Sequence, residues 1–205
     1  SPEIDILGAH QVNIPAVLVS TQSIQYPTLR DYRVPDGQVN NLFQLFEESF
    51  QLNPWKKPDF PWPEKIEIAV AALIFNKNKQ VLLIKRRDNS YWALPTGRME
   101  RGETLEEAVV REIMEELNLK IRVKYLVGLY SHPSDQVLSY SFGETIQFVA
   151  ACFFCEIEEG DLRNNQSEIL ESGFYSVSQL PQPMVDSHLQ WIEDGLRNDG
   201  LTVFR

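Results

Sequence analysis

The sequence lacks a long apolar run and an excess of basic residues, and these shortages exclude two classes of protein. No apolar stretch approaches the roughly 20 residues of a membrane span, and no signal-peptide pattern opens the chain. The 19 Lys and Arg residues face 29 Asp and Glu residues, a net charge of −10. This balance argues against binding nucleic acid through its phosphates. We expect a cytoplasmic protein with neither a membrane nor a nucleic-acid partner. Because the net charge is negative, binding of an anionic substrate would need local basic residues or a metal ion.

Cysteine and histidine are also scarce, which argues against a zinc or redox site. The two cysteines, Cys152 and Cys155, form a CxxC within Gln147–Ile157, an apolar run that predicts a buried strand. Residues three apart on a strand point to opposite faces, so these thiols should not meet. There is no second CxxC, and the three histidines are scattered along the sequence. We expect both cysteines to be structural.

Acidic residues are abundant, and they concentrate in a helical pattern that begins at Thr104. Thr104 and Glu107 form a capping box, which predicts a helix start. At about 100° per residue, Glu112, Glu115 and Glu116 share one edge of this helix. The apolar residues of the same segment gather on another arc, which should pack on a sheet. Asn118 follows the last turn, where a left-handed residue is often needed.

Two interpretations of the acidic edge remain open on the helix alone. Glu-rich helices are often simply solvated, with pairs of opposite charge one turn apart. Glu112 and Glu116, however, repel each other one turn apart. A bound cation would remove that repulsion, since carboxylate oxygens suit Mg²⁺ or Mn²⁺.

The loop before the helix favours the metal-binding interpretation, because the whole segment resembles the Nudix box. Eight of its nine defined positions match, and the exception is Asn118, where the family usually has Gly. Thr96 also stands where a second Gly is usual. The matching residues are Gly97, Glu103, Arg111, Glu112, Ile113, Glu115, Glu116 and Leu119.

The resemblance implies metal-dependent hydrolysis of a nucleoside diphosphate linked to another group. Its implied Mg²⁺ (or Mn²⁺) ligands are the Gly97 carbonyl, Glu112, Glu115 and Glu116. A carboxylate, either Glu115 or Glu116 or one outside the helix, would take a proton from water. Glu103 and Arg111 are interpreted as a supporting pair. Glu168, or else Glu171, resembles an additional catalytic acid of many members, with a solvated loop acid as the alternative.

The substrate is predicted less directly. Basic and aromatic side chains near the expected site could contact phosphates or stack on a base, or could simply be solvated or core residues: Arg86, Arg87, Arg98, Tyr130 and Phe142. Pro133 lies loosely where ADP-ribose hydrolases of the family carry a proline, which favours ADP-ribose or a nucleotide sugar. The alternatives are a nucleoside triphosphate pyrophosphatase and a non-catalytic module that senses a nucleotide.

The expected fold is α+β, an α/β/α sandwich with a mixed sheet between helices, as in the Nudix fold. Residues 64–205 would form the hydrolase domain, and residues 1–63 an N-terminal extension with a Pro/Trp-rich linker. Predicted strands are Glu67–Phe75 with its hairpin partner Val81–Lys85, Arg122–Tyr130, Gln147–Ile157 and Gly173–Val177, followed by a helix at Val185–Leu196. The extension should contain a strand at Ile14–Ser20 and an amphipathic helix within Val39–Leu52. We expect it to pack on the hydrolase domain or on a second copy in a homodimer. Its role would be structural support, with a dimer contact and a cap on the substrate side as the alternatives.

Overall fold

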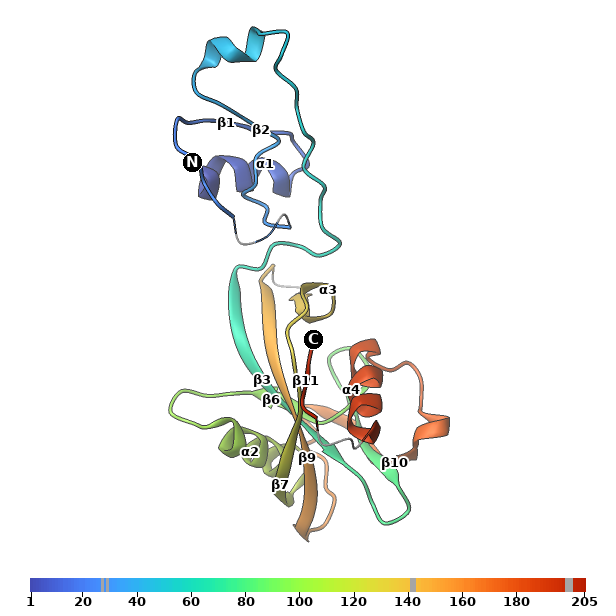
Figure 1. Cartoon of the computed structure of the whole chain (residues 1–205). Helices are drawn as coiled ribbons and strands as arrows, with labels where there is room; N and C mark the ends of the chain where they lie inside the picture. Colours follow the sequence, from blue (N-terminus) through green and yellow to red (C-terminus); the bar gives the residue numbers. More distant parts are fainter. Residues whose placement is uncertain (27, 29, 141–142, 198–200) are drawn as a thin grey trace. The chain divides into compact units, whose positions relative to one another are not determined.

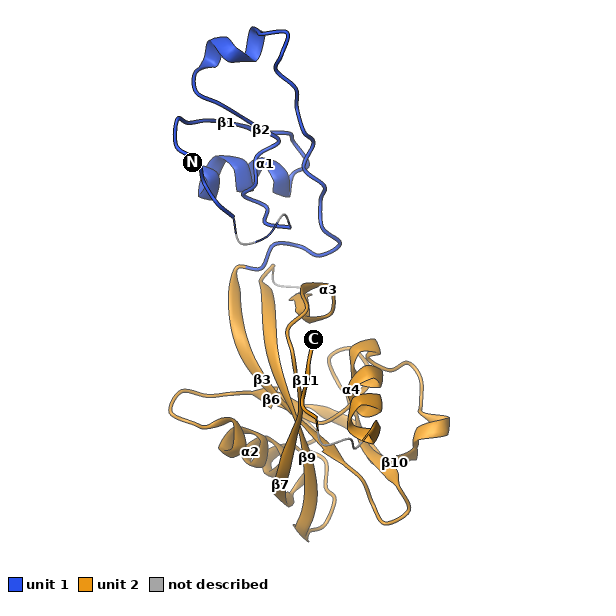
Figure 2. Ribbon diagram, in the orientation of Figure 1, with its two compact units in different colours: residues 1–63 blue, residues 64–205 orange. Residues whose placement is uncertain are grey.

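The structure is a computed structural model that describes residues 1–26, 28, 30–140, 143–197 and 201–205. Contacts between residues divide the chain into two compact units, Ser1–Pro63 and Glu64–Arg205 (Figure 2). Within the described residues, no helix has both the length and the apolar character needed to cross a membrane.

The larger unit is built on a mixed six-stranded sheet. Its strand order is β11-β7-β9-β3-β6, and β8 pairs with β9 at the side of this path. β3 and β9 run parallel, whereas β7 and β9 are antiparallel. The strands are β3 (Lys65–Ile74), β6 (Thr96–Arg98), β7 (Leu119–Tyr130), β8 (Val137–Ser139), β9 (Thr145–Gly160) and β11 (Val203–Phe204).

Two main helices cover the opposite faces of this sheet (Figure 1). α2 (Leu105–Leu117) buries Val109, Ile113 and Leu117 in a core with the residues of one sheet face. α4 (Asp186–Arg197) packs Trp191 and Ile192 into the core on the other face. The predicted α/β/α arrangement is confirmed, because each helix buries its apolar stripe against the sheet. The shorter helices are α3 (Pro133–Gln136) and η3 (Val177–Gln179).

A second sheet corrects the predicted hairpin. β4 (Gln80–Arg86) lies between β10 (Ile169–Ser176) and β5 (Trp92–Ala93). β3 and β4 share only one bridge, from Phe75 to Val81. The two predicted strands and the turn between them are confirmed, but their prediction as paired hairpin strands was wrong beyond this one bridge. The reason is a contact between distant segments: β9 and β6 pair with the two edges of β3, so β4 cannot pair along it.

The two cysteines lie on opposite faces of β9, as expected. Cys155 belongs to the core beneath α2, and Cys152 belongs to the core beneath α4. Both thiols are buried and form no disulfide. Burial also raises the pKa of the Cys155 thiol to about 12, so it stays protonated and unreactive at neutral pH.

α2 begins and ends where the sequence predicts. The Thr104 hydroxyl accepts from the Glu107 N–H at 3.2 Å, and Glu107 accepts from the Thr104 N–H at 2.8 Å. At the other end, Asn118 adopts φ 56° and ψ 36°, a left-handed conformation. Both ends of the acidic helix are thus defined by local sequence.

Replacing Thr104 by Ala should lower the free energy of unfolding by about 1 kcal/mol, because the N-cap acceptor is lost. Chemical denaturation of the two proteins measures this difference. Thr104→Ser keeps the acceptor and should stay close to the wild type, whereas equal losses in both variants would contradict the capping role.

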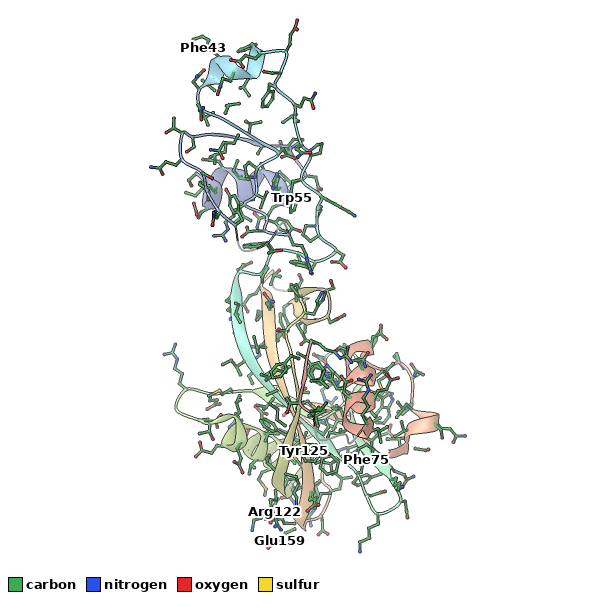
Figure 3. All side chains as sticks on the ribbon, in the orientation of Figure 1. Phe43, Trp55, Phe75, Arg122, Tyr125 and Glu159 are labelled. Atoms are coloured by element: carbon green, nitrogen blue, oxygen red, sulfur yellow. The ribbon has the colours of Figure 1, made fainter. Side chains whose placement is uncertain are left out.

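The smaller unit contains η1 (Pro2–Ile6), α1 (Leu7–Gln11), β1 (Val17–Val19), β2 (Gly37–Val39) and η2 (Leu42–Phe46). β1 confirms the predicted strand and pairs in parallel with β2. The amphipathic helix within Val39–Leu52 was wrong, since only the single 3₁₀ turn η2 forms there. Phe43, labelled in Figure 3, is 83% exposed. Phe46 is 86% exposed, so neither side chain is covered by the apolar surface that a longer helix would need.

A buried polar cluster organises this smaller unit. The two ring nitrogens of His10 lie 2.8 Å from the Tyr32 carbonyl oxygen and 2.8 Å from an Asp36 carboxylate oxygen. The imidazole also stacks on Trp55, with ring centroids 4.3 Å apart. Ala16 donates its N–H to Asp36 at 2.7 Å. Hydrogen bonds between distant segments therefore supplement a small apolar core.

Candidate active site

An acidic cleft of about 570 Å³ opens beside α2. Its walls come from β6 and the loop after it, from one edge of α2, and from the loop before β10. The lining residues are Thr96, Gly97, Arg98, Glu100, Arg111, Glu112, Glu115, Glu116, Asn165 and Glu168. The structure thus brings the glutamates of the helix edge together with the predicted loop acid Glu168.

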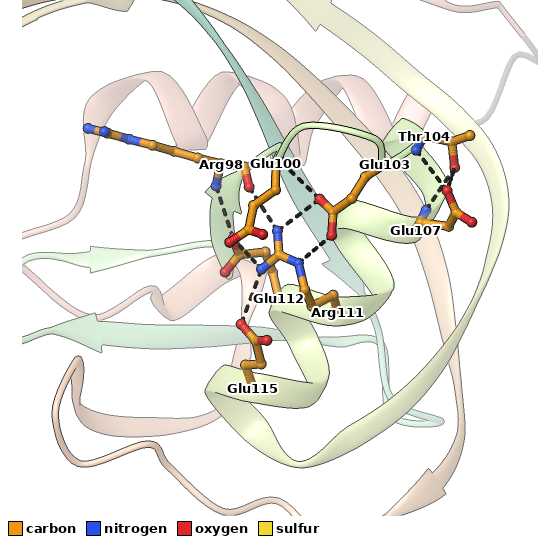
Figure 4. Close-up of polar contacts among 8 residues, drawn as sticks. All are labelled: Arg98, Glu100, Glu103, Thr104, Glu107, Arg111, Glu112 and Glu115. Atoms are coloured by element: carbon orange, nitrogen blue, oxygen red, sulfur yellow. Dashed lines mark hydrogen bonds and ion pairs between the residues drawn. The ribbon is translucent and has the colours of Figure 1, made fainter.

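Arg111 holds three of the predicted glutamates (Figure 4). Its guanidinium binds both oxygens of Glu103, at 2.5 and 3.0 Å. Nη1 lies 3.0 Å from Glu112 and 3.1 Å from Glu115. The hydrogen bonds from Arg111 lower the pKa of the Glu103 carboxyl and keep that group ionised. Glu103 itself is not a cleft-lining residue, so its contact with Arg111 joins the loop to the helix.

The Glu112 carboxylate lies directly against Gly97. A Cβ placed on Gly97 would fall 1.8 Å from the Glu112 carboxyl carbon. One Glu112 oxygen also accepts the Arg98 N–H at 3.1 Å. Burial is the main cause of the raised pKa of this carboxyl, although Arg111 opposes the shift. Gly97 therefore provides the space that lets a helix carboxylate reach the β6 backbone.

Glu116 is the most constrained carboxylate of the cleft. Its side chain is only 6% exposed, and its Oε2 atom is buried without a hydrogen-bond partner. Desolvation, followed by the charges of Glu112 and Glu168, raises its pKa to about 8, while the nearby charge of Arg86 opposes the shift. A buried acid with an unpaired oxygen is unfavourable for folding alone, which is a common property of functional sites.

The loop that carries the predicted acid Glu168 is attached to the end of α2, a contact that the sequence did not predict. The last carbonyls of a helix have no partner within the helix. Here the Arg163 N–H donates to the Leu117 carbonyl at 3.0 Å, and the Asn165 N–H donates to the Glu116 carbonyl at 2.8 Å. Asn165, Thr96 and Glu100 line the cleft but were not predicted to do so. The only signal in the sequence is general: the last carbonyls of any helix need hydrogen-bond donors from another segment of the chain.

Three predicted substrate-binding arginines lie around the cleft in different ways. Arg98 lines it, and its side chain contacts Glu67 at 3.1 Å and the Tyr140 hydroxyl at 3.1 Å. Arg86 forms a two-point ion pair with Asp88, at 3.0 and 2.6 Å. Arg87 donates its main-chain N–H to the Glu168 carbonyl at 2.8 Å.

Other aromatic and acidic candidates are not brought to the cleft. Tyr130 is 3% exposed, stacks on Trp191 and donates its hydroxyl to Asp194 at 3.2 Å. This position suits a core residue and does not support the interpretation that Tyr130 stacks on a base. Glu171 lies on β10, where it accepts from the Tyr175 hydroxyl. Phe142 lies outside the described residues.

The donor chemistry of the cleft fits a divalent metal ion, although its carboxylates do not converge on one point. Among the described residues, no group of three or more His, Cys, Asp or Glu side chains is arranged to hold a metal ion. Two of the implied ligands, Glu112 and Glu115, are instead held by Arg111. The unpaired oxygen of Glu116, which lines the same cleft as Glu112 and Glu168, is the group that a cation would complete.

Known proteins resemble this chain throughout the larger unit. A family model of the NUDIX domain matches residues 65–195. An ADP-ribose pyrophosphatase of Methanocaldococcus jannaschii is 38% identical over 133 residues, which cover 63% of this chain and 73% of that protein. An 8-oxo-dGDP phosphatase of Mus musculus is 32% identical over 148 residues, which cover 68% of this chain and 42% of that protein.

Solved structures agree with the sequence comparisons. The crystal structure of a MutT NUDIX hydrolase from Burkholderia pseudomallei is 27% identical, with a TM-score of 0.55. The match covers 64% of this chain and 98% of that one. The chain therefore belongs to the Nudix family, whose members hydrolyse phosphorus anhydrides.

Proposed function

We propose that this protein is a metal-dependent pyrophosphohydrolase that cleaves a nucleoside diphosphate linked to another group, with ADP-ribose or a nucleotide sugar as substrate. The observation that carries the proposal is the buried, unpaired Glu116 carboxylate at the base of an acidic cleft. Such a group is costly in a folded protein unless a ligand completes it. The same cleft contains all the acidic residues of the Nudix box that would bind metal.

The metal site would use the Gly97 carbonyl together with Glu112, Glu115 and Glu116. A bound Mg²⁺ or Mn²⁺ would neutralise charge on the diphosphate oxygens and polarise a water molecule. Glu103 plays a supporting part, because its pair with Arg111 fixes the loop that follows β6, the strand that carries Gly97.

The remaining roles belong to side chains at the rim. Glu168 lies exposed at the opening of the cleft, where its carboxylate can accept a proton from the attacking water. Arg86 and Arg98 would bind the phosphates of the substrate, since both guanidinium groups lie near the acidic cleft. Arg87 lies beside Glu168 and would contribute its positive charge to the same rim.

ADP-ribose is favoured by the M. jannaschii relative, which is named as an ADP-ribose pyrophosphatase and is 38% identical. A second candidate class is the free nucleoside phosphates, the triphosphates among them, because the mouse relative is named as a phosphatase of a free nucleotide, 8-oxo-dGDP. A nucleotide sensor without catalysis is the third class, and the retained glutamates of the box argue against it.

A panel of nucleotides tests this proposal. ADP-ribose, NADH, dinucleoside polyphosphates, nucleotide sugars and nucleoside triphosphates are incubated with the protein in Mg²⁺ and then in Mn²⁺, and the products are separated by chromatography. We expect ADP-ribose or a nucleotide sugar to be cleaved fastest, and chelation of the metal to stop the reaction. Preferred cleavage of a triphosphate would support the second class. Binding without cleavage of any compound would contradict the enzymatic proposal.

A further inference from the structure

We propose that Asn165 is a positioning residue that holds Glu168 at the acidic cleft beside α2, which Glu116 also lines. The inference rests on the function proposed above. Asn165 lines the acidic cleft, but its side chain is directed to its own loop. Asn165 forms two separate sets of hydrogen bonds. Its N–H binds α2, whereas its carbonyl and its side chain bind the turn that carries Glu168.

The first set fixes the loop to the helix. The Asn165 N–H donates to the Glu116 carbonyl at 2.8 Å, in the last turn of α2. This carbonyl is one of the helix-end acceptors that need an outside donor. The loop is therefore attached to the same residue whose side chain lies buried in the cleft.

The second set closes the turn before β10. The Asn165 side-chain oxygen accepts from the Ser167 N–H at 3.2 Å and from its hydroxyl at 2.7 Å. The Asn165 carbonyl accepts from the N–H groups of Glu168 and Ile169, at 3.1 and 2.9 Å. This is the hydrogen-bond pattern of a helix N-cap, which Asn, Asp and Ser form best. From the other side, Arg87 holds the Glu168 carbonyl at 2.8 Å.

Such a restraint is needed because the two carboxylates repel each other. Glu168 and Glu116 line the same cleft, and like charges that share a site repel each other. Glu168 is exposed, and an unrestrained side chain would move into solvent and away from Glu116. The turn capped by Asn165 opposes that movement.

Asn165→Ala tests the role through steady-state kinetics on the compound that the wild type cleaves best. We expect kcat to fall by about ten- to a hundredfold, since small displacements of a reacting group have effects of this size. KM should stay within about twofold, because Asn165 itself does not bind the substrate. Asn165→Ser keeps a neutral capping oxygen and should restore most of kcat.

A neighbouring residue provides the matched control. The Asn164 side chain accepts from the Ser172 hydroxyl and is not among the cleft-lining residues. Asn164→Ala should therefore retain nearly wild-type kcat. Loss of kcat in this control equal to that in Asn165→Ala would show general damage to the loop and would overturn the positioning role.

A double-mutant cycle with Glu168→Gln identifies the group through which Asn165 acts. In that background Asn165→Ala should cost little more than Glu168→Gln alone, because the positioned group is already lost. Additive losses, or a Glu168→Gln variant with wild-type kcat, would overturn the inference. A wild type that cleaves nothing would overturn the proposed function as well, whereas an active wild type with an equally active Asn165→Ala variant would overturn only the role of Asn165.

Discussion

Glu116→Gln should lower kcat by about a thousandfold, which corresponds to about 4 kcal/mol of transition-state stabilisation. Glutamine has nearly the same shape as glutamate, so the fold should be retained. It cannot supply the negative charge that a divalent ion needs, although it leaves an oxygen in place. Glu116 is the carboxylate with the unpaired buried oxygen, and its loss should affect the reaction more than loss of an exposed acid.

Circular dichroism and kinetics on the same preparation separate the two effects. Glu171→Gln is a suitable control, because Glu171 is an acid of β10 outside the cleft lining. It should retain activity close to that of the wild type. A Glu116→Gln protein with wild-type kcat would contradict the assignment of Glu116 to the metal site.

In the metal-free protein, Glu116→Gln should also change how thermal stability depends on pH, in a direction that can be predicted. The pKa of Glu116 is about 8 in the folded state, compared with 4.5 as its ordinary value. Between these pH values the folded state binds more protons than the unfolded state, so the stability contributed by this group is lost as pH rises. Glutamine does not titrate. With chelator present, Glu116→Gln should have a higher Tm than the wild type above pH 8 and a similar Tm near pH 4.

The acidic helix could be predicted because its determinants are local. The capping box at Thr104, the spacing of Glu112 and Glu116 and the left-handed Asn118 all depend on neighbours within one or two turns. Each of these features is present in the structure. The burial of Cys152 and Cys155 on opposite faces follows equally from the two-residue period of a strand.

The features that could not be predicted depend on contacts between distant segments. The attachment of Asn165 to the Glu116 carbonyl joins residues 49 positions apart, and no spacing rule relates them. Val81 follows β3 after a short turn, yet its strand pairs with β10 in another sheet. The helix expected around Phe43 failed for a related reason, since an amphipathic pattern forms a stable helix only where a partner covers its apolar face.

Gly97→Ala should abolish most activity for a steric reason. Gly97 is not among the residues with positive φ, so its backbone conformation alone is accessible to alanine. The added Cβ would lie 1.8 Å from the Glu112 carboxyl carbon and 2.2 Å from one of its oxygens. The carboxylate must therefore move and lose the Arg98 N–H bond. We expect kcat/KM to fall by about a hundredfold or more.

Stability measurements in two backgrounds show whether Glu112 is the cause. In the wild-type background, Gly97→Ala should lower the free energy of unfolding by about 1–3 kcal/mol, the usual cost of overpacking. In a Glu112→Ala background the conflicting carboxylate is absent, and the same change should have little effect. Equal losses in both backgrounds would mean that the backbone of β6, and not the Glu112 carboxylate, requires glycine. If the free energy of unfolding falls only in the background that retains Glu112, the missing side chain at Gly97 is what makes room for the Glu112 carboxylate.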